Sequence, residues 1–374
     1  MSLDRVSRAL GAAALATTTA AGALTACGSD DNRPSASAAT LPGPAGTVSC
    51  AGKNVLTAEG SMAQQNAIAV FNQVWGQYCP GKSVAYNPTG SGAGREQFLA
   101  GLVDFAGTDS PLVSGQIRPA AKRCNGNPAW DLPLVFGPVA LVYKLPGVHT
   151  LIVNGDVLAK IFSGTITKWN DPILAALNDG VALPDTKITP IYRSDSSGTS
   201  DSLQRYLATA APRSWTRGVG TEFQGGVGEG ALKSAGVIQA VRTTPVAIGY
   251  VEKGFADQAS VPFAQIYTGS GPVALTNDTA RSAMDAVEFA AGGNDVVLDL
   301  NPVYASRQPG AYPLVLATYQ VVCSKGYNPE TFNAIRSFLI VAVNNGQNDL
   351  SSAGYVPLPD KVKERVVTAI NAMQ

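Results

Sequence analysis

The sequence predicts an α/β protein in which strands and helices alternate and several strands end in small polar residues. Short strand patterns run into polar or proline-containing turns at three places: LTAEGSM (56–62), SVAYN (83–87) and TKITPIY (186–192). A helical pattern follows the first of them, because apolar residues in AQQNAIAVFNQVWGQY (63–78) recur every three or four positions. These residues are Ile68, Phe71, Trp75 and Tyr78. With 374 residues, the chain has room for about two domains.

The charge balance argues against a polyanionic partner. Charged residues make up 14% of the chain and the two signs are equal in number, so no broad attraction for nucleic acid is expected. No stretch after the N-terminal region has the roughly 18 uninterrupted apolar residues of a membrane-spanning helix. We therefore expect no nucleic-acid partner and no spanning helix in the mature protein.

The N-terminus is predicted to be an export signal. Residues 1–26 carry two arginines and then a run of small and apolar residues. The run ends in LTAC (24–27), which resembles a bacterial lipobox, where cleavage leaves a lipid-bearing cysteine. This resemblance implies a mature protein that begins at Cys27 and is anchored by lipid to the outer face of the cytoplasmic membrane. Residues 28–47 are rich in Ser, Ala, Pro and Gly, which predicts a flexible tether. A plain secretory signal with an incidental cysteine is the alternative.

The remaining cysteines predict two disulfides. Four of them are left in an oxidising compartment once Cys27 is set aside: Cys50, Cys79, Cys124 and Cys323. Three pairings are possible. Cys50 with Cys79 would join a strand start to a helix end, which leaves Cys124 with Cys323. A zinc site is disfavoured, since the sequence has no C-x-x-C spacing and one histidine, His149.

One stretch matches a nucleotide-binding pattern by its letters alone. GQYCPGKS (76–83) fits the Walker A motif G-x-x-x-x-G-K-S. That motif needs a strand before it and a helix after it, because the helix N-terminus supplies the N–H groups that bind phosphate. Here the predicted order is helix, turn, strand, so we reject a nucleotide site.

A second polar, glycine-containing stretch has the order that an anion site requires. RSDSSGTS (193–200) follows a strand and opens a helix, with a Ser or Thr near 199–200 as its cap. The amides of Ser197, Gly198 and Thr199 would point at a bound oxyanion, and Arg193 would add donors. On its own, a capped helix without a ligand explains this stretch equally well.

Three more segments place polar residues at strand ends. Ser61 is the predicted cap of the helix at 63, and Ser91 lies at the start of the helix in TGSGAGREQFL (89–99). The buried strand LVDFAGTDS (102–110) ends in Thr108 and Asp109. Open α/β sheets place ligands at the carboxyl ends of strands. We expect four helix starts, each after a strand, to converge on one small anion.

Together these stretches resemble a known family. GSMAQ, YNPTGSGAGREQFLAGLVDFAGTDSPL, IYRSDSSGTS and TPVAIGYVE, in this order, look like the PstS-type phosphate-binding lipoproteins of ABC phosphate importers. The resemblance covers essentially the whole mature chain. It implies a two-lobed periplasmic-binding-protein fold of type II, each lobe a mixed β-sheet flanked by helices. It also implies a monomer, without cofactor or enzyme activity, that binds inorganic phosphate tightly in the interlobe cleft and delivers it to an ABC phosphate permease.

The resemblance assigns phosphate ligands by position. They are the hydroxyls and amides of Ser61 and Ser91, the amide of Met62, the carboxylate of Asp109, the guanidinium of Arg193, and the amides and hydroxyls of Ser197, Gly198 and Thr199. Asp195 supports Arg193. A carboxylate beside an anion requires a proton on the ligand, which phosphate has and sulfate lacks. Ser196 and Glu59 stand where glycine is frequent in the family, and Glu59 would bring a negative charge near Ser61.

The family's two chain crossings are expected near 134–140 and 311–318. Residues 48–135 with 316–374 would then form lobe 1, ending in the helix DKVKERVVTAINAM, and 136–315 would form lobe 2. Three side features are also predicted. Trp169 should pack in the core or the hinge and not stack on a ligand. The stretch 227–241 should be a glycine-capped helix, and Glu229 with Gly225 and Gly226 should line the cleft.

Two other functions stay open from the residues alone. Sulfate, molybdate or a phosphorylated metabolite could replace phosphate, because the spacing does not name the anion. A secreted phosphatase or serine hydrolase would need Ser197 and Asp195 to meet His149, which lies in the loop-like PGVHTL. No carboxylate–histidine cluster for paired metals is visible, so we favour a binding protein.

Overall fold

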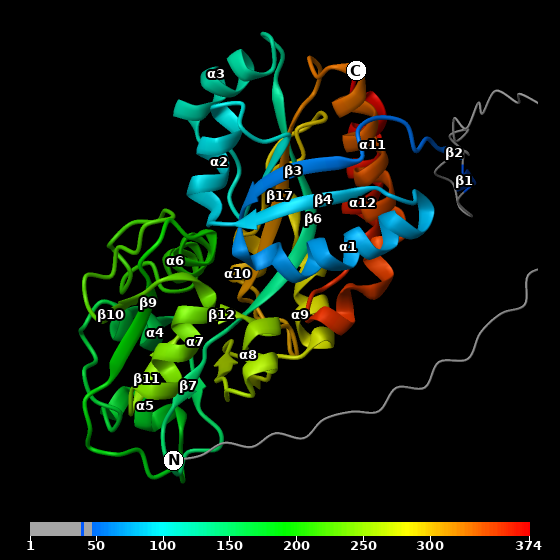
Figure 1. The fold of residues 1–374 in the computed structure, drawn as a ribbon. Coiled ribbons are helices and arrows are strands. Elements are labelled where there is room, and N and C mark those ends of the chain that lie inside the picture. The colour runs from blue at the N-terminus through cyan, green and yellow to red at the C-terminus, as the bar shows by residue number, and fades with distance from the viewer. Residues whose placement is uncertain (1–38, 41–46) are drawn as a thin grey trace, which may run out of the picture. The chain divides into compact units, whose positions relative to one another are not determined.

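The computed structural model describes residues 39–40 and 47–374 (Figure 1). The predicted signal peptide, Cys27 and most of the predicted tether lie outside the described residues. A short antiparallel pair, β1 (Ala39–Thr40) with β2 (Thr47–Val48), precedes the main fold. Within the described part of the chain, every helix is too short or too polar to cross a bilayer.

The larger sheet is mixed and has six strands in the order β12-β6-β17-β5-β3-β4. Its strands are β3 (Val55–Gly60), β4 (Ser83–Pro88), β5 (Phe105–Thr108), β6 (Ala129–Ala140), β12 (Val251–Glu252) and β17 (Val315–Cys323). β3 is parallel to β4 and β5, whereas β17 runs antiparallel to β5 and β6. The carboxyl ends of β3 and β5 therefore meet at one edge of the sheet, as the sequence predicts.

Helices from both ends of the chain pack around this sheet (Figure 1). They are η1 (Met62–Gln64), α1 (Gln65–Tyr78), α2 (Ser91–Leu99), α3 (Ser114–Arg123), α11 (Pro329–Asn344), η3 (Gly346–Ala353) and α12 (Asp360–Ala372). The predicted apolar face of α1 is buried at Ile68, Phe71 and Trp75, and the Trp75 ring lies 5.4 Å from that of Phe338 in α11. The predicted C-terminal helix is confirmed as α12.

The smaller sheet has four strands in the order β10-β9-β11-β7. It comprises β7 (Tyr143–Lys144), β9 (Thr189–Arg193), β10 (Glu229–Ala231) and β11 (Ala247–Gly249). The helices in this part of the chain are α4 (Gly155–Phe162), α5 (Pro172–Leu177), α6 (Gly198–Ala210), α7 (Lys233–Thr243) and α8 (Lys253–Ala259). α8 contacts α7 and also β6 and β12 of the larger sheet. The prediction of one helix over 227–241 is wrong at its start, because 229–231 pair in parallel with β9. Trp169 is fully buried and donates to Val246 O, which confirms core packing.

Short elements complete the region before β17. They are β8 (Ile152–Val153), β13 (Gln265–Tyr267), β14 (Pro272–Val273), α9 (Asn277–Ala283), η2 (Met284–Ala286), β15 (Glu288–Phe289), β16 (Leu298–Asp299) and α10 (Asn301–Tyr304). β13 lies between β8 and β14, and β15 pairs with β16. α10 packs against α6 near the carboxyl end of β5.

The chain passes between the two sheets more often than the sequence predicts. The expected crossing at 134–140 falls within β6, which leads to β7, and the one at 311–318 leads into β17. A further passage runs from β11 through Tyr250 to β12, which pairs with the end of β6. The lobe boundaries themselves stay a prediction.

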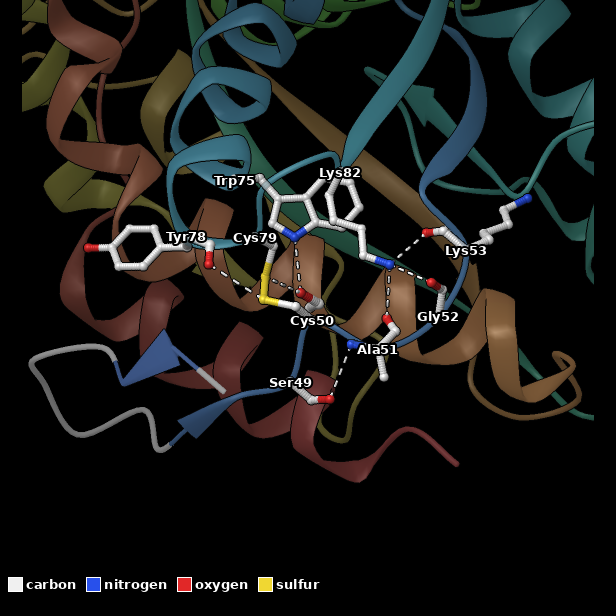
Figure 2. The surroundings of a disulfide bond; sticks show 10 residues. Ser49, Cys50, Ala51, Gly52, Lys53, Trp75, Tyr78, Cys79 and Lys82 are labelled. Atoms are coloured by element: carbon white, nitrogen blue, oxygen red, sulfur yellow. Dashed lines mark hydrogen bonds between the residues drawn. A yellow bond between two sulfur atoms is a disulfide. The ribbon is translucent and has the colours of Figure 1, made fainter. Parts of the chain in front are cut away.

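The Walker-like stretch has a structural role (Figure 2). α1 ends at Tyr78, Gly81 takes a φ of +85° in the turn, and β4 begins at Ser83. Lys82 is only 6% exposed and its ammonium donates to three backbone carbonyls, those of Ala51, Gly52 and Lys53. The lysine that would hold a phosphate in a P-loop is thus bound to the chain itself, and the rejection of a nucleotide site is supported.

The predicted disulfide pairing is confirmed. Cys50, just after β2, joins Cys79 at the end of α1 (Figure 2), and Cys124 at the end of α3 joins Cys323 at the end of β17. Both bonds fix a helix end to a segment beside it. The second one links residues 199 positions apart, so it closes a much longer loop in the unfolded chain than the first, which spans 29.

Removing the long-range disulfide should therefore destabilise the protein more than removing the short one. The loop-closure relation gives about 5 kcal/mol for the Cys124–Cys323 bond and about 3.5 kcal/mol for Cys50–Cys79. We expect the double variant Cys124→Ala/Cys323→Ala to unfold at lower denaturant concentration than Cys50→Ala/Cys79→Ala. Guanidinium unfolding curves of the two variants and the parent test this order. A reversed order would show that unfolded-chain entropy is not the main contribution.

Candidate functional site

Polar side chains from two parallel strands meet at the carboxyl edge of the larger sheet. Ser61 follows β3 and caps η1, accepting a hydrogen bond from the Ala63 amide at 3.0 Å. Its hydroxyl donates to Asp109 Oδ1 at 2.6 Å, and Asp109 follows β5. Ser91 begins α2, where its Oγ accepts from the Asp109 amide at 3.0 Å and donates to Oδ2 at 3.2 Å. Three of the predicted residues are thus in direct contact.

A third hydroxyl binds the same carboxylate and was not predicted. The hydroxyl of Thr318 donates to Asp109 Oδ1 at 2.6 Å. Thr318 lies in β17, where the pairing with β6 shifts register between Thr318 and Tyr319. Such an irregularity can redirect a side chain, which explains why alternation along the strand does not reveal it. The available signal was a hydroxyl in the otherwise largely apolar run VLATYQVVC, all of which is buried.

Burial controls the ionisation of Asp109. The side chain is 7% exposed, and burial raises its pKa to about 6, with the charge of Glu252 adding to the shift. The hydroxyls of Ser61, Thr318 and Ser91 lower the pKa and limit the shift, since they stabilise the charged form. A pKa of about 6 leaves the carboxyl group mainly ionised at neutral pH, where it acts as a hydrogen-bond acceptor.

This shift predicts a pH-dependent stability. The folded protein holds the Asp109 proton more tightly than the unfolded chain, so Asp109 stabilises the fold below about pH 4 and loses this contribution as the pH rises through about 6. Asparagine stays neutral, so the unfolding free energy of Asp109→Asn relative to the parent should rise by about 3 kcal/mol across that window. Urea unfolding of both ligand-free proteins at a series of pH values measures the difference. A difference that is independent of pH would contradict a raised pKa.

Two buried arginines contribute positive charge. Arg95 in α2, which was not predicted, donates from Nη1 to Thr108 Oγ1 at 2.9 Å and to Ser110 Oγ at 3.2 Å, on either side of Asp109. The second comes from β9. Arg193 is 2% exposed; its Nε donates to Asp195 Oδ1 at 2.8 Å, and its Nη1 donates to Ser234 Oγ at 2.9 Å. Burial alone would lower the pKa of Arg193, but the bond to Asp195 and the charge of Glu252 raise it. Burial would raise the pKa of Asp195, and Arg193 holds it low instead. The predicted contact between Arg193 and Asp195 is present, whereas Ser234 in α7 was missed.

The start of α6 lies against the Asp109 cluster. α6 begins at Gly198 with Ser197 as its cap, whose Oγ accepts from the Ser200 amide at 3.3 Å. The cap is thus two residues earlier than expected, because Gly198 already has helical conformation. A Cβ on Gly198 would lie 2.4 Å from both Asp109 Oδ2 and Ser91 Oγ. The strand ends of one sheet and the helix start after the other are therefore in van der Waals contact.

Some of the predicted hydrogen-bond donors already donate to other protein groups. The Ser61 amide donates to Gly107 O at 2.8 Å as part of the link between β3 and β5, and the Ser197 amide donates to Thr221 O at 2.9 Å. Both residues thus offer the site a hydroxyl but no amide. Met62 follows Ser61 and is buried, and the hydroxyl of Thr199 donates to Glu252. Glu252 was not predicted as a site residue. It is the last residue of TPVAIGYVE, one of the stretches that resemble the family, and this resemblance was the available signal for it.

The expectation of four helix starts is wrong by one. α3 does not follow Asp109 directly, because it begins only at Ser114 with Val113 at its cap. Pro111 lies in the intervening turn and the Leu112 amide donates to the Asp131 carboxylate, at 3.2 Å to Oδ2. Three helix starts and one strand end therefore form the cluster.

The side chains of Glu59 and Ser196 do not bond to Asp109, although the Ser196 carbonyl accepts from the amide of Gly92, next to Ser91, at 3.3 Å. The Glu59 carboxylate accepts from Thr89 Oγ1 at 2.8 Å and from Asn87 Nδ2 at 3.3 Å. Ser196 Oγ donates to Thr221 Oγ1 at 2.8 Å. Glu229 begins β10 opposite Ile191 and lines a separate hollow with Lys187 and Pro190, so the structure does not bring it to the Asp109 cluster.

The structure does not bring His149 together with Ser197, the pair considered for a hydrolase site. His149 is exposed in the loop after β7, whereas Ser197 is fully buried, so the two do not form a hydrogen-bonded pair. Over residues 39–40 and 47–374, no three His, Cys, Asp or Glu side chains are grouped as metal ligands.

Comparisons with known proteins give a consistent result. A family model described as a PBP superfamily domain matches residues 15–343. The phosphate-binding protein PstS 3 of Mycobacterium tuberculosis is 44% identical over 377 residues, which covers 100% of both chains. PstS 2 of the same species is 45% identical over 94% of this chain and 95% of its own.

Solved structures resemble the fold. A high-affinity periplasmic phosphate-binding protein, PfluDING, with bound phosphate has a TM-score of 0.67 at 22% identity, covering 84% of this chain and 93% of the other. A phosphate-binding protein from Stenotrophomonas maltophilia has a TM-score of 0.64 at 20% identity, with coverage of 84% and 94%. At these identities the likeness concerns the fold alone.

Proposed function

Because the chain belongs to the PBP superfamily and, within it, to the PstS phosphate-binding proteins, we propose that it binds inorganic phosphate at the Asp109 cluster and delivers it to an ABC phosphate permease. The predicted fold class is that of this superfamily. One observation carries the proposal for the site: a buried carboxylate with three hydroxyl donors lies in contact with the start of α6, and the buried Arg95 bonds the residues on either side of it. Such a set combines donors for an anion with an acceptor for its proton.

Neutral groups supply most of the donors for the ligand. The amides of Gly198 and Thr199 belong to the first turn of α6, where N–H groups lack partners within the helix. Each serine hydroxyl has a single proton, so Ser61 and Ser91 donate either to Asp109 or to a bound anion. When phosphate binds, its own P–OH group would donate to Asp109 and free those hydroxyls for the other phosphate oxygens.

The same exchange explains selectivity. Sulfate has no proton at neutral pH, so it would leave the Asp109 carboxylate facing an anion without a hydrogen bond between them. A buried, unpaired charge of this kind costs several kcal/mol. Arg193 does not remove the difficulty, because Asp195 already neutralises it. The site therefore selects for a protonated anion more than for negative charge.

The cellular setting is proposed from the sequence. LTAC (24–27) supports export and a lipid on Cys27 at the outer face of the cytoplasmic membrane, and these residues lie outside the described structure. We propose a monomer that binds and releases phosphate without chemical conversion. Mass spectrometry of the N-terminal peptide of the membrane-extracted protein would detect the lipid, and an unmodified Cys27 would contradict the anchor.

Calorimetry tests the function directly. The mature chain with Cys27→Ser would be unfolded with its disulfides intact, refolded to remove carried-over ligand, and titrated with phosphate and separately with sulfate. We expect one phosphate per chain with a Kd of about 1 μM or lower and no heat from sulfate. No phosphate binding would overturn the proposal. Equal binding of sulfate would indicate a site that does not distinguish a protonated anion from an unprotonated one. Turnover of a phosphomonoester by the same sample would show an enzyme instead.

A further inference from the structure

A cationic hollow lies between the end of α2 and α3, two helices that pack against each other (Figure 1). It has a volume of about 660 Å³, and Arg118, Lys122 and Arg123 of α3 line it. The stretch 110–130, which contains α3, has three basic residues and no acidic one. Within the described part of the chain, none of the three cations forms a salt bridge. Their charges are therefore available to an anionic partner.

The three cations are held in different ways. The Arg123 guanidinium lies over the Phe98 ring, 5.0 Å from its centroid, and its Nη2 donates to Val103 O at 3.1 Å. Arg118 and Lys122 are exposed and lie one helical turn apart, so they share a face of α3. An anionic group in this hollow would thus meet two exposed cations beside one that is fixed by the protein.

Exposed apolar side chains border the hollow. Leu99 and Gly101 line it, and Leu102, the next residue, is 68% exposed. Ile117, next to Arg118 in α3, is 52% exposed. A single exposed apolar residue is ordinary, but apolar side chains beside unpaired cations suit an anionic lipid surface. The cations attract the lipid phosphates, and the apolar side chains enter the headgroup region.

The chain enters the fold from the predicted tether at the same edge of the larger sheet. Lys53 precedes β3, and its Nζ donates to Asp104 Oδ1 at 2.6 Å. Asp104 precedes β5, and its neighbour Val103 accepts the hydrogen bond from Arg123. The hollow therefore lies near the amino ends of β3 and β5, whereas the Asp109 cluster lies at their carboxyl ends.

The predicted lipid on Cys27 would keep this edge close to the membrane. Residues 28–47 join Cys27 to the fold, and a flexible chain of 20 residues spans about 25 Å on average. A lipid chain and a basic patch together hold a protein on a membrane more firmly than either does alone. A permease that receives phosphate must face the Asp109 cluster, at the opposite ends of the strands. Lipid headgroups therefore match this surface better than the permease does.

We propose that the cationic hollow between α2 and α3, with Leu102 and Ile117 at its border, binds the anionic phospholipid headgroups of the membrane that carries the anchor. Arg118, Lys122 and Arg123 attract the lipid phosphates. The Asp109 cluster takes no part, because it lies at the other end of the same strands. Lipid binding and phosphate binding should thus be independent of each other.

Vesicle flotation measures this interaction without the anchor. The mature chain with Cys27→Ser is mixed at low salt with vesicles of phosphatidylcholine alone or of phosphatidylcholine with phosphatidylglycerol. We expect at least about tenfold stronger binding to the vesicles that contain phosphatidylglycerol, because each cation near an anionic surface contributes severalfold. About 1 M salt should abolish the difference, since charges are then screened beyond about 3 Å. Equal binding to both kinds of vesicle, or binding to neither, would overturn the proposal.

Two charge-reversal variants locate the surface. Arg118→Glu/Lys122→Glu changes two exposed side chains of the hollow and should weaken binding to the anionic vesicles at least about tenfold. Arg242→Glu/Arg307→Glu makes the same change of net charge at two exposed arginines in other segments and should bind within a few-fold of the parent. An equal loss in both variants would show that net charge, and not this surface, attracts the vesicles.

A second pair of variants tests the apolar border. Leu102→Asn should weaken vesicle binding severalfold, whereas Leu232→Asn, at a leucine that is 63% exposed before α7, should not. Equal binding by these two variants would contradict a role for Leu102.

Phosphate calorimetry distinguishes a lipid headgroup from free phosphate. Arg118→Glu/Lys122→Glu should keep the parental phosphate affinity, with one phosphate per chain, in the presence and absence of vesicles. A second phosphate bound by the parent and lost in this variant would assign the hollow to free phosphate and overturn the lipid proposal. Absence of phosphate binding by the parent would overturn the proposed function and leave the vesicle result to stand alone.

Discussion

Gly198→Ala is expected to abolish tight phosphate binding while the protein remains folded. The added Cβ would lie 2.4 Å from Asp109 Oδ2 and from Ser91 Oγ, closer than real Cβ contacts allow. The start of α6 would have to move away from the end of β5 and the start of α2, so its amides and the Asp109 carboxylate could no longer reach one small anion together. We expect the affinity for phosphate to fall by more than about a hundredfold, or about 3 kcal/mol.

Gly115→Ala is the matched control for this change. Gly115 lies in the first turn of α3, and an added Cβ there would meet no atom within 4 Å. Calorimetric titration with phosphate should therefore give the parental affinity for Gly115→Ala, and both variants should unfold cooperatively in urea. Phosphate binding by Gly198→Ala within a few-fold of the parent would show that the contact between α6 and Asp109 does not belong to the bound state.

Asp109→Asn is expected to change which anion binds. The asparagine amide can donate to an unprotonated oxygen and no longer repels it, so sulfate should gain affinity. Phosphate should lose affinity, because its P–OH group would donate to a neutral carbonyl oxygen instead of a carboxylate. We expect the preference for phosphate over sulfate to shrink by at least about a hundredfold, which corresponds to about 3 kcal/mol. Paired titrations with the two anions at neutral pH measure the ratio.

Asp104→Asn removes the same charge from the same segment. The Asp104 carboxylate precedes β5 and accepts from Lys53 Nζ at 2.6 Å and from the Thr57 amide at 2.6 Å. Its loss should lower stability but leave the ratio of the two affinities unchanged. If Asp109→Asn also left the ratio of phosphate affinity to sulfate affinity unchanged, the Asp109 carboxylate would not be the group that recognises the proton of the ligand.

These expectations share one physical basis, which is that the site is built from uncharged donors and buried acceptors. Both buried arginines are occupied by protein groups: Asp195 binds Arg193 through both carboxylate oxygens, and Arg95 donates to Thr108 Oγ1 and Ser110 Oγ on either side of Asp109. The charge of a ligand should therefore contribute little to its selection. The positions of its protons should contribute more, because an acceptor such as Asp109 is buried and is costly when the ligand donates no hydrogen bond to it. The affinity should accordingly respond to pH more than to ionic strength.

The local features of this protein could be predicted from its sequence. The helix after Ser61, the helix start at Ser91 and the strand that ends at Asp109 are all where the residue patterns place them. Apolar periodicity and end caps depend on residues only a few positions apart, so they can be recognised from the sequence alone. The local pattern of residues 63–78 likewise showed that Lys82 follows a helix and not a strand.

Only the tertiary structure decided which distant side chains share the site. Thr318 reaches Asp109 across 209 positions because β17 lies beside β5, and Glu252 reaches Thr199 because β12 returns to the larger sheet. Strands that are buried on both faces carry no alternation that would show where a hydroxyl or carboxylate points. The order of strands sets these contacts, and it depends on the packing of the whole chain. The sequence alone therefore determined the ends of the elements, and the fold determined which of those ends meet.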